Sequence, residues 1–202
     1  MGYGLQTFSL LNMLAHEGLL PKIKRVVDLL NLEFKGLKTF ATLSPVPGFR
    51  KWVMARLETV AEHDGELLSG AERKRVAALR PNMSDSDGLR ELLETPDWHR
   101  NSEIAAALDA PLTRLCAQYV VHEKRGAGYA ANPVAHFHLS NGARVERLNW
   151  LGDTSDNGLS TSAGLMVNYL YLRADIEKNN ESYRGEGTVP RSSAVSALAK
   201  VR

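Results

Sequence analysis

The stretch from Asn132 to Trp150 constrains the fold of this chain more than any other. Residues 134–139 and residues 144–150 each alternate in the manner of a half-buried strand, and Asn141-Gly142 lies between them. An Asn-Gly pair tolerates the positive φ angles that a tight hairpin turn requires. The pattern therefore predicts a β-hairpin whose two strands are joined at this turn.

The first of these predicted strands carries two histidines. Because side chains alternate between the faces of a strand, His136 and His138 would share one face, and Phe137 would lie on the other. Two imidazoles on one face of a strand are unusual, and a strand holds a titratable ring rigidly. We therefore expect the chemistry of the protein to lie here.

A second stretch, far upstream, is the candidate to lie beside this hairpin. Residues 37–43 predict a short apolar strand with Ser44 at its C-terminal end. Pro45 and Pro47 follow, and they end the strand with a stiff, extended exit. An amphipathic helix is predicted before it, over Leu19–Leu32. Ser44 is well placed for a site, because ligands commonly bind where the strands of an open sheet end.

The remainder of the chain is predicted to be mainly helical and to belong to one domain, residues 1–202. Residues 50–110 are polar and charged with several Gly and Pro breaks, and they predict a helical insertion within that domain. A further helix is predicted over Pro111–Lys124. Residues 162–174 are apolar and aromatic, and their pattern fits either a strand or a helix.

Composition narrows the class of protein without indicating a function. The formal net charge of +2 gives no argument for nucleic-acid binding and would equally suit an anionic small ligand. Cys116 is the only cysteine, so an intrachain disulfide is impossible and a buried, inert thiol is the favoured interpretation. No apolar run is long enough to cross a membrane and no targeting segment is recognised. We therefore expect a cytoplasmic protein with no membrane or nucleic-acid partner.

Two motifs of the chain are specific, a Leu-Ser-Pro-x-Pro-Gly-Phe segment and a Pro-Val-Ala-x-Phe-His segment. They belong to a set of segments that follow one another along the chain: Thr42–Phe49, Arg114–Ala117, Glu123–Arg125, Asn132–Leu139, Asn141–Ala143, Arg147–Trp150 and Gly164–Tyr171. These segments resemble, in order, the catalytic domain of the malonyl-CoA decarboxylase family. The resemblance covers roughly residues 22–183.

The resemblance implies a fold and a reaction. The fold would be α+β, a mixed sheet flanked by helices similar to that of the GNAT acyltransferases, with the N-terminal strands of that sheet missing from this chain. The reaction would be the conversion of malonyl-CoA to acetyl-CoA and carbon dioxide, with no cofactor and no metal. The partners would be malonyl-CoA, acetyl-CoA and, in a homo-oligomer, other copies of the chain.

The resemblance also implies roles for individual residues. The family serine maps onto Ser44 and the family histidine onto His138, and both would contact substrate as well as act in catalysis. A family tyrosine matches Tyr171. A glutamate of the CoA-binding loop would fall on Glu17, next to Gly18. Since losing carbon dioxide leaves an enolate on the thioester, the site must stabilise an oxyanion and then deliver a proton to carbon.

The proton-delivery step suits an imidazolium that titrates near neutral pH. We therefore expect His138 to be the proton donor. Ser44 would hydrogen-bond the malonyl group and act as proton acceptor in a relay with His138, and Tyr171 would orient one of the two.

Two departures from the family pattern are visible. His136 stands where the family more often has asparagine, and it would replace an amide hydrogen bond. Residues 15–20 occupy the place of a glycine-rich loop that meets the CoA pyrophosphate, but they contain one glycine. Residues 1–13 resemble nothing in the family. The chain thus resembles the C-terminal part of a catalytic domain.

Other hypotheses fit parts of the pattern. His136 and His138 could begin a metal site, although no third ligand has a suitable spacing. Ser44, His138 and Asp153 could form a hydrolase triad, although no Gly-x-Ser-x-Gly elbow surrounds the serine. A GNAT-like domain that binds acyl-CoA or transfers an acyl group, and a truncated remnant without activity, are the alternatives to a decarboxylase.

Overall fold

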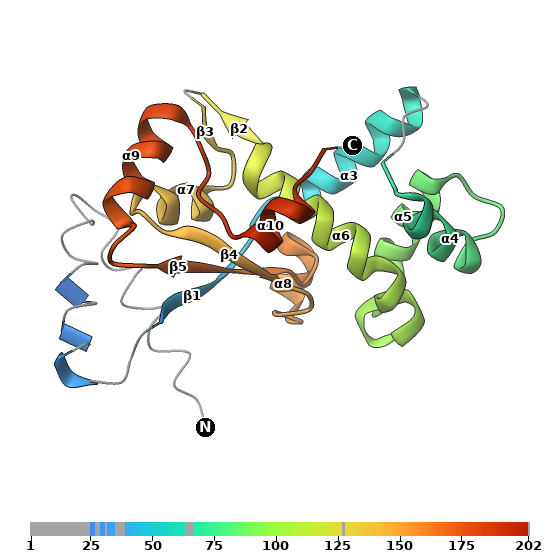
Figure 1. Cartoon of the computed structure of the whole chain (residues 1–202). Coiled ribbons are helices and arrows are strands. Elements are labelled where there is room, and N and C mark those ends of the chain that lie inside the picture. Colours follow the sequence, from blue (N-terminus) through green and yellow to red (C-terminus); the bar gives the residue numbers. More distant parts are fainter. Residues whose placement is uncertain are drawn as a thin grey trace.

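The computed structural model describes residues 39–63, 67–126 and 128–201, together with residues 25–26, 29–30 and 32–34. In this part of the chain a small sheet is combined with many helices, so the predicted α+β class is confirmed (Figure 1). The elements are β1 (Phe40–Pro45), α3 (Phe49–His63), α4 (Gly70–Leu79), α5 (Asp85–Glu94), η1 (Trp98–Arg100), α6 (Ser102–His122), β2 (Lys124–Arg125), β3 (Tyr129–Ala130), α7 (Pro133–Ser140), β4 (Arg144–Asn149), α8 (Asp156–Ser162), β5 (Met166–Tyr171), α9 (Ile176–Glu186) and α10 (Ser193–Leu198).

The sheet that organises the described residues is three-stranded, with the order β1-β5-β4. Both pairings are antiparallel, so residues far apart in the sequence become neighbours: Thr42 lies opposite Tyr169, and Ser44 lies opposite Val167. On its other side β4 is joined by the C-terminal segment, because Val145 N donates to Pro190 O. The strand predicted upstream of Ser44 is confirmed as β1, and residues 162–174 resolve into the central strand β5.

The predicted hairpin is half wrong, because its first strand is the helix α7. Asn132 accepts a hydrogen bond from Ala135 N through Oδ1, and Pro133 occupies the first turn; both are strong helix-start features. The buried residues Ala135, His138 and Leu139 recur at helical and not strand spacing. The second strand is confirmed as β4. The predicted turn before it is also confirmed, because Gly142 has the positive φ, 78°, that such a turn requires.

Because α7 is a helix, its two histidines do not share a face. Neighbours two positions apart on a helix point in different directions, since each residue turns the helix by about 100°. His138 is buried toward the sheet, whereas His136 is half-buried and contacts α9 through Tyr183. The expectation that both imidazoles line one surface is therefore wrong.

The helices from α3 to α6 extend to one side of the sheet, and α7 and α9 lie at its opposite end (Figure 1). This helical character over residues 50–110 agrees with the sequence pattern, and the description of the segment as an insertion stays a prediction. The helix predicted to begin at Pro111 begins earlier, and Pro111 lies inside α6. Asn101, ten residues before Pro111, is the N-cap, and its Oδ1 accepts hydrogen bonds from Glu103 N and Ile104 N. The predicted helix over Leu19–Leu32 lies largely outside the described residues.

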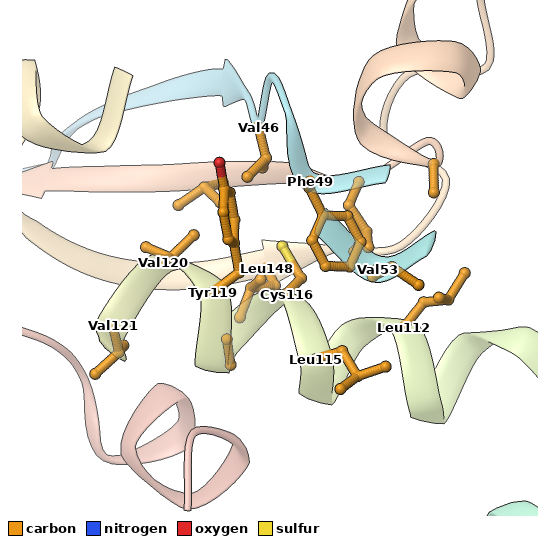
Figure 2. Packing of buried hydrophobic residues seen from close by; sticks show 14 of the residues in the cluster. Val46, Phe49, Val53, Leu112, Leu115, Cys116, Tyr119, Val120, Val121 and Leu148 are labelled. Atoms are coloured by element: carbon orange, nitrogen blue, oxygen red, sulfur yellow. The ribbon is translucent and has the colours of Figure 1, made fainter. Parts of the chain in front are cut away.

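The core forms where α6 crosses the sheet and α3. Figure 2 shows Cys116 on α6 with its sulfur directed into a cluster that includes Phe49 and Leu148. The Cys116 side chain is fully buried, and burial raises the pKa of its thiol far above the ordinary value. The predicted burial of this thiol is confirmed, and its chemical inertness follows from the same environment.

Candidate active site

Three separate elements bring the predicted site residues together. Ser44 comes from β1, Tyr171 from β5 and His138 from α7. Alternation along the two antiparallel strands puts Thr42 and Ser44 on one face of β1, and Tyr169 and Tyr171 on the same side of β5. The helix α7 packs over this face with the imidazole of His138 pointing at it.

The side chains form a continuous hydrogen-bonded chain. His138 Nε2 lies 3.0 Å from Ser44 Oγ, and His138 Nδ1 lies 2.8 Å from Tyr171 Oη. Ser44 Oγ in turn donates to Thr42 Oγ1 at 3.1 Å. Both ring nitrogens of one imidazole are thereby engaged, so the ring has a fixed orientation and can pass a proton between a phenol and an alcohol.

This chain is shielded from water. Only 4% of His138 and 2% of Ser44 is exposed. Burial lowers the pKa of His138 from its ordinary value of 6.5 to about 3, because a charged ring would lose its hydration. The expectation of an imidazolium near neutral pH is therefore wrong for this structure, in which the resting ring is neutral. Burial also raises the pKa of Tyr171, which keeps its phenol protonated.

A second tyrosine holds the face of the imidazole. The rings of His138 and Tyr169 stack with their centroids 4.3 Å apart and their planes at 18°. Tyr169 is completely buried, and its hydroxyl has no hydrogen-bond partner among the residues that the structure describes. The stacking restricts rotation of the imidazole about its last torsion, while the two hydrogen bonds fix its edge.

Asn132 links the segment that follows Ser44 to the helix that carries His138. Its side chain is fully buried and uses both ends: Oδ1 caps α7, and Nδ2 donates to Pro47 O at 2.9 Å. Pro47 lies three residues after Ser44, in the exit from β1. One amide thus joins the start of the histidine helix to the end of the serine strand.

His136 belongs to a different cluster. Its Nδ1 lies 2.9 Å from Tyr183 Oη, and Tyr129 packs on the same ring with centroids 5.0 Å apart. Burial lowers the pKa of His136, and the charges of Arg125 and Arg184 lower it further. The metal-site hypothesis needs two imidazoles side by side, and α7 separates them; the described residues contain no group of three or more His, Cys, Asp or Glu side chains able to hold a metal ion.

The hydrolase-triad hypothesis is also contradicted. The nitrogen of His138 that would face a carboxylate faces the phenol of Tyr171 instead. Asp153 lies in the loop before α8, where its Oδ1 accepts from Ser155 N at 3.0 Å. Its predicted role as a loop cap is confirmed.

The remaining predicted site residues, Glu17 and Gly18, lie outside the described residues. Conversely, sequence reasoning missed Thr42 and Tyr169. Strand alternation could have indicated Thr42, because it stands two positions before Ser44 on the predicted strand. It could also have related Tyr169 to Tyr171, once residues 162–174 were assigned to a strand.

Comparisons with known proteins show the family of this chain. The model of the malonyl-CoA decarboxylase C-terminal domain family matches residues 10–202. The malonyl-CoA decarboxylase of Rattus norvegicus is 42% identical over 178 residues, and that of Anser anser anser is 41% identical over 175 residues. This chain belongs to the malonyl-CoA decarboxylase C-terminal domain family.

Solved structures give the same result for the fold. The malonyl-CoA decarboxylase of Rhodopseudomonas palustris superposes with a TM-score of 0.73 at 40% identity, over 87% of this chain and 36% of that chain. The one from Agrobacterium vitis gives 0.71 at 39% identity, over 89% of this chain and 40% of that chain. The matches to the two curated relatives include 86–87% of this chain but only 34–36% of the relatives' own length. The chain therefore spans about a third of the length of these relatives.

Proposed function

We propose that this chain decarboxylates malonyl-CoA to acetyl-CoA and carbon dioxide. The observation that carries the proposal is the buried 3.0 Å contact between Ser44 Oγ and His138 Nε2, in a chain of the malonyl-CoA decarboxylase family. The names of the relatives support the substrate. The site supplies the shielded environment and the proton relay that the proposed reaction requires.

Carbon–carbon bond cleavage is the first step. The bond between the α-carbon and the carboxylate breaks, carbon dioxide leaves, and the electron pair moves into the thioester as an enolate. The thioester itself accepts the electrons. A site shielded from water favours this step, because a carboxylate loses hydration there while a delocalised enolate loses less. Ser44 Oγ is the group that contacts the malonyl unit.

Protonation of the α-carbon is the second step. His138 donates its Nε2 proton to Ser44 Oγ, and Ser44 passes its own proton to carbon. At the same time the phenol of Tyr171, 2.8 Å from Nδ1, gives its proton to Nδ1 and becomes a phenolate. After the product leaves, a proton from water at Ser44 lets these shifts reverse, so that the phenol and the Nε2–H ring are restored. The imidazole therefore stays neutral during the transfer, which agrees with the strongly lowered pKa of His138. A positioned acid of this kind contributes about 10²- to 10⁴-fold in rate.

The wider setting is part of the same proposal. Glu17 and Gly18 would contact the CoA portion, the active form would be a homo-oligomer, and the protein would act in the cytoplasm on malonyl-CoA of fatty-acid metabolism. The two curated relatives are mitochondrial malonyl-CoA decarboxylases by name, so the cytoplasmic location of this chain stays a prediction. Within the described ranges, no helix combines the length and the apolar character needed to cross a membrane.

The test is acetyl-CoA formation from malonyl-CoA by the purified chain, with Ser44→Ala beside it. Ser160→Ala is a matched control, because Ser160 is exposed and lies on α8. We expect turnover in the wild-type chain and the control and a loss of most turnover in Ser44→Ala, with all three folded. CoA binding without release of carbon dioxide would favour an acyl-CoA binder, and a folded chain that does neither would favour a remnant without activity.

A further inference from the structure

Thr42 is the last member of the hydrogen-bonded chain and has no role in the reaction described so far. Its Oγ1 accepts the hydrogen of Ser44 at 3.1 Å, and its side chain is half-buried, whereas Ser44 is almost fully buried. The strand holds it firmly: Thr42 O accepts from Asn168 Nδ2 at 2.9 Å, and Asn168 Oδ1 accepts from Asn149 Nδ2 at 3.0 Å. Asparagines from β5 and β4 therefore fix this residue across the sheet.

Counting hydrogens gives the chain a direction. A serine hydroxyl has a single hydrogen to donate. Because Ser44 gives that hydrogen to Thr42, it can only accept from His138, so Nε2 must carry the ring proton. Nδ1 of a neutral ring is then an acceptor, and it takes the hydrogen of Tyr171 Oη. All three hydrogen bonds therefore run in one direction: Tyr171 donates to His138, His138 donates to Ser44, and Ser44 donates to Thr42.

We propose that Thr42 is a positioning residue that selects the Nε2–H tautomer of His138 and so sets the direction of proton transfer. It does this by giving the Ser44 hydrogen an acceptor on the half-buried side of the site. The tautomer of the resting protein does not depend on the proposed function, whereas its consequence for turnover rests on it.

Removal of the threonine oxygen should reverse the chain. Valine has nearly the same shape and suits a strand, but it has no acceptor. In Thr42→Val the Ser44 hydroxyl would turn to the nearest remaining acceptor, His138 Nε2. The ring proton would then move to Nδ1 and point at Tyr171 Oη. The hydrogen bonds of the relay would then point away from Ser44, and the phenol of Tyr171 could no longer donate a proton to Nδ1.

The direct measurement is the two-bond ¹H–¹⁵N spectrum of the histidine rings in the ¹⁵N-labelled chain at neutral pH, with the His138 signals assigned by their loss in His138→Asn. We expect the Nε2–H pattern in the wild type and in Thr42→Ser, and the Nδ1–H pattern in Thr42→Val. Thr42→Ala serves as a second variant should valine disturb the strand. An unchanged Nε2–H tautomer in folded Thr42→Val and Thr42→Ala would overturn the proposal.

Turnover of malonyl-CoA by the same variants separates this inference from the proposed function. We expect kcat to fall about tenfold or more in Thr42→Val, KM to change little, and Thr42→Ser to restore the rate. A wild-type chain without turnover but with a tautomer that follows residue 42 would contradict the function and support the inference. Full turnover in Thr42→Val with an unchanged tautomer would support the function and contradict the inference.

Discussion

The helix α7 provides the histidine of two histidine–tyrosine pairs, and the two pairs differ in what surrounds them. His138 and Tyr171 are buried against the sheet, and the second ring nitrogen of His138 reaches Ser44. His136 and Tyr183 lie on the α9 side, where Tyr183 Oη also accepts the backbone N–H of Ala130. The same pair of side chains thus lies in the proposed proton relay in one place and ties α7 and α9 to β3 in the other.

The electrostatic causes differ as well. Burial alone lowers the pKa of His138, whereas burial acts on His136 together with the charges of Arg125 and Arg184. Salt should therefore weaken part of the effect on His136 and leave His138 unchanged. In the proposed reaction His138 is suited to proton transfer because each ring nitrogen has a hydroxyl neighbour, Ser44 or Tyr171, and a perturbed pKa alone would not be sufficient.

The largest difference between the pairs should appear in acid stability. The folded pKa of His138 is about 3 and the unfolded pKa about 6.5, so between these values the unfolded chain binds more protons. The contribution of the neutral His138 ring to the free energy of unfolding is fully present above pH 6.5. It falls as the pH drops toward 3, by up to about 1.4 kcal/mol per pH unit. Urea unfolding between pH 4 and 7 should show a shallower dependence in His138→Asn than in the wild type. An equal slope in the two would contradict the burial of a neutral ring.

The second difference concerns the two phenols. Tyr171→Phe removes the hydroxyl that donates a proton to His138 Nδ1 in the proposed relay. We therefore expect kcat to fall by about 10- to 100-fold, a cost of roughly 1.4 to 2.7 kcal/mol in activation free energy. Steady-state turnover of malonyl-CoA measures this, with Tyr183→Phe as the matched control. Equal rates in the two variants would show that Tyr171 only fills space.

Tyr183→Phe should instead lower stability. The substitution leaves the buried N–H of Ala130 without its acceptor, at a cost of about 1 to 3 kcal/mol. The midpoint of chemical unfolding should fall, while kcat stays near the wild-type value. A large loss of turnover without a loss of stability would make the second pair part of the reaction.

Tyr169→Phe should have the smallest effect. The hydroxyl that it removes is buried and has no partner among the described residues, so its loss should stabilise the fold by about 1 kcal/mol. The phenyl ring keeps the stacking on His138. Thermal unfolding and kcat measured together would test this; a lower melting temperature would indicate that the hydroxyl has a partner after all.

The sequence predicted the parts of the site that local pattern determines. The strand at Ser44, the strand β4 and the turn at Gly142 follow from alternation and from turn chemistry. The sequence pattern suggested that the Ser44 strand lies beside the histidine segment, whereas the place of Tyr171 in the same site followed only from the family resemblance. Alternation alone could not predict the order β1-β5-β4, because antiparallel pairing of strands over a hundred residues apart is decided by packing.

The error at α7 has a specific cause. Residues 134–139 are only six, and His136 and His138 alternate with apolar residues, so a period of two fits them. A period of 3.6 fits this short segment as well, and its length did not separate the two. The decisive features are Asn132 as a cap and Pro133 in the first turn, which start a helix and were not used in the prediction. The neutral state of His138 was equally out of reach, because burial is a property of the assembled fold.

The central claim is that the His138 pair, and not the His136 pair, carries the decarboxylation. The measurement that tests it most directly is the release of labelled carbon dioxide from carboxyl-¹³C malonyl-CoA by the wild-type chain, His138→Asn and His136→Asn, each verified as folded. We expect release by the wild type and His136→Asn, and a loss of about 10²-fold or more in His138→Asn. Wild-type release by His138→Asn, or an equal loss in both variants, would contradict the account.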